Sequence, residues 1–214
     1  MQTALGWAML ALVLLAAIPF GANVPVAWTL LALGVLALFA GQVGLLFVRP
    51  AAPALQRTAL PTALYLAVVL WALAQSALPV DETFAHPLSA LAPEGARARI
   101  GPDPGKGVHL AMRLATYGMV AWLMAAAALK AERAWAFLMA IGVFSTALAI
   151  YGILAGLSGV NPVLRGNAGI AGQFTATFVN RNSYATYAAF GMLVNIVCYL
   201  HLAGRGTAGD ERGA

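Results

Sequence analysis

The stretch VAWTLLALGVLALFAGQVGLLFV, residues 26–48, contains no acidic or basic residue and is stopped by Arg49 and Pro50. About 20 helical residues of this kind are enough to cross a hydrocarbon core of about 30 Å. The stretch therefore predicts a membrane-spanning helix, and with it the class of the fold.

The composition of the whole chain agrees with this prediction. Hydrophobic residues make up 62% of the sequence and charged residues 9%, and the mean hydropathy is +0.83. Because a soluble domain carries about 25% charged residues, this chain has too few polar groups to cover a surface in water, and soluble fold classes are excluded. The net charge of +5 is scattered between apolar segments, so we expect membrane lipid and no nucleic acid as a partner.

Turns, prolines and charged residues separate further apolar segments. Together they predict an all-α, polytopic helical bundle with six transmembrane helices, at about residues 3–20, 26–48, 59–78, 108–129, 134–157 and 183–202. Two long loops, 80–107 and 158–182, and a disordered tail, 204–214, complete the chain. The first apolar segment has no Lys or Arg ahead of it, so we expect a retained helix rather than a cleaved signal peptide.

The positive residues of the short loops predict the orientation. If the spans alternate, one side of the membrane receives Arg49, Arg57, Lys130, Arg133, Arg205 and Arg212. The positive-inside rule makes this side cytoplasmic. We therefore predict that both termini are cytoplasmic and that the two long loops, 80–107 and 158–182, lie on the outer side.

Several patterns that resemble known sites fail on spacing or context. Gly101–Gly107 has neither the Gly-Lys-Ser/Thr end nor the preceding strand of a phosphate loop. His86 and His109 lack the accompanying Cys and the helical spacing of a metal site. No Ser-His-Asp arrangement is present, and the single Cys198 allows no intrachain disulfide. We expect no metal and no cofactor, and we identify no catalytic residue.

Arginine and asparagine side chains next to the predicted spans are the candidate binding residues. Arg113 is predicted one to two turns inside the fourth span, and Arg165, Asn180, Arg181 and Asn182 lie in the loop before the sixth. Guanidinium groups bind phosphate in a bidentate fork, so these arginines predict an anion site on the outer side. Two structural alternatives stay open: Arg113 snorkels to the membrane surface, and Asn182 or Ser183 caps the sixth helix.

Three short motifs resemble one family in order and spacing. Residues 178–187, FVNRNSYATY, resemble the motif that enters a membrane helix in the O-antigen ligase/polymerase-like proteins. Residues 85–88, AHPL, and 100–104, IGPDP, followed by Arg113 through Tyr117, resemble two upstream motifs of the same family. The resemblance implies a bacterial inner-membrane glycosyltransferase that moves a glycan from undecaprenyl pyrophosphate to an acceptor on the periplasmic side.

Two departures from the family shape the functional hypothesis. Family members have about twice as many spans, and their second half carries a loop with a His and further Arg residues. Many also carry an Arg a few residues before the motif, where this sequence has Gln173. We therefore expect the N-terminal portion of such a transferase, inactive alone and completed by a C-terminal half. The alternatives are a small transporter or lipid-binding membrane protein, and a structural membrane subunit without catalysis.

Overall fold

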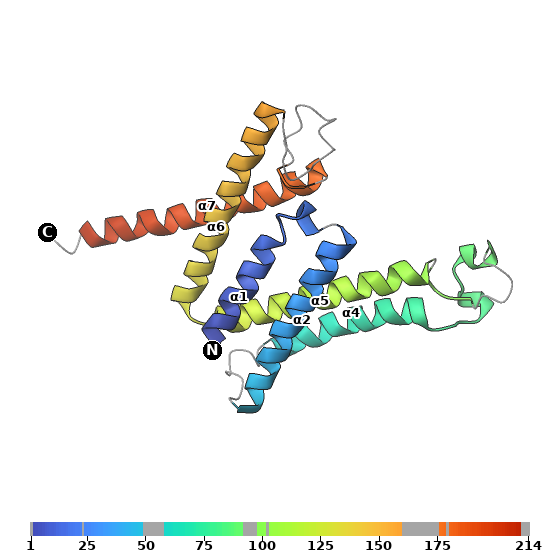
Figure 1. The fold of residues 1–214 in the computed structure, drawn as a ribbon. Helices are drawn as coiled ribbons and strands as arrows, with labels where there is room; N and C mark the ends of the chain where they lie inside the picture. Colours follow the sequence, from blue (N-terminus) through green and yellow to red (C-terminus); the bar gives the residue numbers. More distant parts are fainter. Residues whose placement is uncertain are drawn as a thin grey trace. The chain divides into compact units, whose positions relative to one another are not determined.

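The computed structural model describes residues 2–22, 24–48, 58–91, 98–101, 103–159, 176–178 and 180–210. These residues form α-helices and short 3-10 helices and contain no β-strand beyond one isolated bridge between Pro79 and Arg99 (Figure 1). In chain order the helices are α1 Gln2–Leu15, η1 Phe20–Ala22, α2 Pro25–Val48, α4 Ala59–Ala77, η2 Glu82–Phe84, η3 Pro87–Leu91, α5 Pro104–Ala127, α6 Ala131–Ser158 and α7 Arg181–Asp210.

Five of these helices are long and apolar enough to cross a membrane. Their spans are Pro25–Phe47, Ala59–Ala77, Gly105–Ala127, Ala131–Ser158 and Arg181–Gly204. Large apolar side chains on these helices are exposed, including Leu30, Leu64 and Leu193. Exposure of this kind along whole helices suits a lipid environment. The chain is therefore a multi-pass, all-helical membrane protein, as the sequence predicts.

The first apolar segment differs from the prediction of one helix over residues 3–20. α1 ends at Leu15 after 14 residues, about 21 Å at 1.5 Å per residue, which is short of a 30 Å hydrocarbon core. The cause is Pro19, which has no N–H to donate and disfavours the helical conformation in the residue before it. From Ala16 the chain continues in short turns to η1.

Other boundaries move outward from the predicted spans. α5 begins at Pro104 rather than near residue 108, α6 at Ala131 rather than 134, and α7 at Arg181 rather than 183. α7 also continues to Asp210, where the sequence predicted a disordered tail from residue 204. Once a helix is nucleated, each further residue adds a hydrogen bond at low cost, so a long span extends readily past its apolar part.

The chain divides into two compact units, residues 1–34 with 126–214, and residues 35–125. In the first unit, α6 and α7 approach closely where a side chain on Gly191 would lie 2.6 Å from Ser145 Oγ. At the same place Asn195 Nδ2 donates to the Gly191 carbonyl at 2.9 Å and to Thr146 Oγ1 at 3.2 Å, and reaches the Gly142 carbonyl at 3.3 Å. Small residues and an interhelical amide therefore hold this helix pair together.

Aromatic pairs extend the same packing along α6. Trp135 near the start of α6 stacks on His201 of α7, with ring centroids 3.6 Å apart and an interplanar angle of 13°. Two residues further along, Phe137 meets Trp7 of α1 edge to face at 4.9 Å. Because the start of α6 meets the later part of α7, the two helices run antiparallel.

In the second unit, α4 and α5 form an antiparallel pair. Tyr65 Oη donates to the Leu114 carbonyl at 2.6 Å, and the same ring lies against Gly118. At the other end of the pair, Gly107 lies so close to Ser76 that a Cβ would overlap the serine hydroxyl. The end of α4 is therefore fixed beside the start of α5.

Candidate functional site

Asn180 caps the N-terminus of α7. Its side-chain Oδ1 accepts a hydrogen bond from the Asn182 backbone N–H at 2.8 Å, and its backbone carbonyl accepts the first intrahelical bond, from Tyr184 N at 3.1 Å. This is the geometry of an N-cap residue. The sequence left open that Asn182 or Ser183 caps this helix. The cap is Asn180 instead, because the helix begins two residues earlier than predicted.

Ala176 and Thr177, shortly before the cap, are buried, and Thr177 is bonded to the turn that follows α1. Thr177 is 2% exposed, and its Oγ1 donates to the Ala17 carbonyl at 2.6 Å across 160 positions of sequence. Ala176, 1% exposed, has a φ of +46°, in the left-handed region that residues with a Cβ rarely adopt. Such strain persists only where the surrounding packing imposes it. The chain therefore enters α7 at a fixed position.

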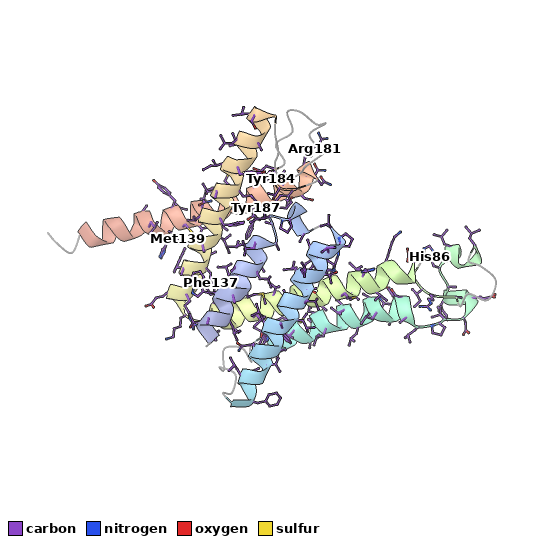
Figure 2. The ribbon with its side chains drawn as sticks, in the orientation of Figure 1. His86, Phe137, Met139, Arg181, Tyr184 and Tyr187 are labelled. Atoms are coloured by element: carbon purple, nitrogen blue, oxygen red, sulfur yellow. The ribbon has the colours of Figure 1, made fainter. Side chains whose placement is uncertain are left out.

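Phe178 and two tyrosines complete this anchor. Phe178 lies 6.0 Å from Tyr184 and 5.3 Å from Tyr187, measured between ring centroids. It also packs on Gly21, where the positive φ of +62° and the close ring leave no room for a side chain. These rings surround a small core that includes Leu148. The aromatic residues of the FVNRNSYATY motif are therefore its partly buried, structural half (Figure 2).

The polar half of the motif is exposed. Asn180, Arg181, Asn182 and Ser183 all lie on the surface at the first turn of α7, and Figure 2 shows Arg181 at this end of the helix. The first turn contains no acidic residue. Unpaired backbone N–H groups and the helix dipole make such an end attractive to anions, and a guanidinium adds a charged donor. This arrangement can hold a phosphate group.

The other two predicted site arginines are not placed relative to Arg181. Arg113 is half-buried on α5, in the second unit. Arg165, like Gln173, lies outside the described residues. The grouping of three guanidinium groups in one site stays a prediction.

The start of α5 is a feature that the sequence analysis missed. Asp103 Oδ1 accepts from the Lys106 backbone N–H at 3.0 Å, and Lys106 Nζ lies 3.3 Å from Asp103 Oδ2. The backbone hydrogen bond, with the Lys106 side chain in support, lowers the pKa of the Asp103 carboxyl from its ordinary value. An Asp directly before Pro104 is a strong signal for a helix start, and it could have placed this boundary correctly.

His86, weighed as a metal ligand in the sequence, has a local structural role. Its Nδ1 accepts a hydrogen bond from the Leu88 backbone N–H at 3.2 Å. Within the part of the chain that the structure describes, no group of three His, Cys, Asp or Glu side chains could hold a metal ion.

No family model, curated protein or solved structure matches this chain. The resemblance to the O-antigen ligase/polymerase-like proteins therefore rests on the three sequence motifs.

Proposed function

We propose that the start of α7 binds the phosphate groups of a lipid-linked glycan. The protein would be the N-terminal portion of an O-antigen ligase-like transferase, whose donor is a glycan on undecaprenyl pyrophosphate. The observation that carries the proposal is the first turn of α7, where an exposed Arg181 stands at a capped helix N-terminus without an acidic residue.

The anchor below the first turn supports this function. A binding group is effective when its backbone is held in place before the ligand arrives. Thr177 and Phe178 provide that support through the buried bond to Ala17 and the contact with Gly21. The exposed polar groups of Asn180 and Asn182 are then available to orient sugar hydroxyls.

The membrane arrangement belongs to the same proposal. We propose a bacterial inner-membrane protein with six crossings and both termini in the cytoplasm, in which α1 and the turns up to Ala22 make the first crossing. The start of α7 then faces the periplasm. A glycan carried on undecaprenyl pyrophosphate is presented at that face.

The chemistry assigned to this chain is stabilisation of the leaving group. When the bond from the glycan to the pyrophosphate breaks, negative charge develops on the phosphate oxygens, and a positioned guanidinium stabilises it. Arg113 and Arg165 are further candidates for this role. We assign no general base to this chain, so the activation of the acceptor hydroxyl belongs to the C-terminal half that the resemblance implies.

Binding of undecaprenyl pyrophosphate to the purified protein in lipid nanodiscs tests the proposal. A hydrogen bond to a charged group contributes roughly 1.5–3 kcal/mol, so Arg181→Gln should weaken binding by roughly tenfold to a hundredfold. The matched control is Arg133→Gln, which removes an arginine from the first turn of α6, at the opposite end of the antiparallel helix pair. Equal affinity of the two variants would sink the proposal.

A further inference from the structure

The segment between α4 and α5 is fastened to the end of α4. The Gly101 backbone N–H donates to the Gln75 carbonyl at 3.0 Å, and Arg99 Nη1 donates to the Ser76 carbonyl. Arg99 also forms an antiparallel bridge with Pro79. These bonds reach the last turn of the membrane-spanning part of α4, which ends at Ala77. Residues 98–101 therefore lie at the membrane surface.

The first half of the segment between α4 and α5 also lies close to the end of α4. Val80 N–H donates to the Ala98 carbonyl at 3.0 Å, and His86 N–H donates to the Arg99 carbonyl at 2.8 Å. Because Arg99 is bridged to Pro79, His86 lies close to the residues that directly follow α4. Figure 2 shows His86 beside the ends of α4 and α5. η3, which begins at Pro87, therefore starts next to the membrane surface.

Large apolar side chains are exposed on this returning segment. Phe84 at the end of η2 is 72% exposed, and on η3 Leu88 is 53% and Leu91 82% exposed. Leu88 and Leu91 are three residues apart in a 3-10 helix, where side chains at this spacing share one face. Exposed apolar side chains gathered in one short segment mark a contact with a partner or a membrane.

We propose that Phe84, Leu88 and Leu91 insert into the boundary between lipid headgroups and acyl chains, at the membrane surface where α4 ends. The segment would then be a membrane-interface anchor. Lipid is the expected occupant because the exposed apolar surface of α4 ends close to these three side chains. The exposed apolar surface of α4 includes Trp71 and ends at Leu78, which is 57% exposed, and the hydrogen bond from His86 to Arg99 brings the start of η3 back to this end of the helix.

Exposed acidic side chains limit which part of the segment can insert. Asp81 and Glu82 are exposed at the start of this segment, before the three apolar residues. Acidic side chains are repelled by anionic headgroups, so the attraction comes from apolar insertion and the carboxylates stay in water. The anchor is independent of the phosphate site proposed at α7 and does not rest on it.

Site-directed spin labels in vesicles test the anchor. In a Cys198→Ala background, which removes the single native cysteine, one cysteine each is placed at 84, 88 and 91 and labelled with a nitroxide. The full chain is reconstituted in phosphatidylethanolamine with a minority of phosphatidylglycerol. Collision rates are measured with oxygen, which concentrates in lipid, and with a nickel chelate, which stays in water.

Two matched controls set the scale. Glu82→Cys reports an exposed position of the same segment in water. Leu64→Cys reports an exposed position inside the apolar span of α4. We expect labels at 84, 88 and 91 to collide with oxygen several times more than the Glu82→Cys label, and less than the Leu64→Cys label. Values equal to those at Glu82→Cys would overturn the anchor. Protection from both reagents would overturn it as well, because it would show that a protein surface covers the segment.

Discussion

Replacing Thr177 with valine tests whether the entry to α7 is held by a buried hydrogen bond. The substitution keeps the shape of the side chain and removes its hydroxyl, which donates to the Ala17 carbonyl at 2.6 Å. Among the described residues, that carbonyl then keeps a longer bond from the Gly21 N–H, at 3.3 Å. Leaving a buried acceptor poorly satisfied costs roughly 1–3 kcal/mol, so we expect a loss of about 2 kcal/mol.

The buried thiol of Cys198 provides the assay. Cys198 lies on α7 and is buried, so a thiol-reactive dye labels this single cysteine when the packing around α7 opens. Labelling is followed as the temperature rises. In a chain of about 200 residues, each kcal/mol of lost stability lowers the midpoint temperature of unfolding by roughly 2–4 °C. We therefore expect the Cys198 thiol of Thr177→Val to become reactive about 4–8 °C below that of the parent protein.

Thr186→Val is the matched control. Its hydroxyl also donates to a backbone carbonyl, that of Asn182 at 3.0 Å, but the side chain is exposed. Surface changes of this kind stay within about 0.5 kcal/mol, so its midpoint should shift by at most about 2 °C. If Thr177→Val and Thr186→Val have the same midpoint, the buried bond to Ala17 does not hold the segment, and our explanation of how α7 is positioned is refuted.

Three further predictions concern caps and packing. Asn180→Ala should lower stability by about 1 kcal/mol through loss of the N-cap, whereas Asn182→Ala should be near neutral; the thiol assay distinguishes them. Asn195→Leu should cost about 0.6–1.7 kcal/mol by removing the α6–α7 amide bonds, seen as an earlier midpoint in the same assay. The pKa of the Asp103 carboxyl is lowered in the folded protein. Ionised Asp103 should therefore stabilise the start of α5 above the ordinary pKa of Asp, and this stabilisation should be lost as the pH falls through the lowered pKa. A carboxyl carbon NMR titration should show the lowered pKa, and Lys106→Gln should reduce the shift.

Much of the fold could be predicted because long apolar runs decide it locally. The run at 26–48 corresponds to α2, Pro25–Val48, almost residue for residue. Boundaries were harder, because they depend on single side chains. Pro19 ends the regular part of α1 early, and Asp103 starts α5 before the apolar residues begin.

The candidate site was only partly readable from sequence. A cation at Arg181 beside an apolar span is visible without a structure. The division of the motif into a partly buried aromatic half and an exposed polar half is not visible in this way, because it depends on contacts of Thr177 with Ala17 and of Phe178 with Gly21. Those contacts join residues more than a hundred positions apart, and no local pattern encodes them.

Photo-crosslinking with a diazirine-bearing polyprenyl pyrophosphate tests the central claim most directly. The protein has two long helices, α6 and α7, that begin beside cationic residues at opposite ends of an antiparallel pair: Arg133 lies in the first turn of α6 and Arg181 in that of α7. Our account predicts saturable labelling of residues 177–187, lost in Arg181→Gln and kept in Arg133→Gln. Labelling of residues 130–137 instead, or labelling that Arg181→Gln leaves unchanged, would contradict it.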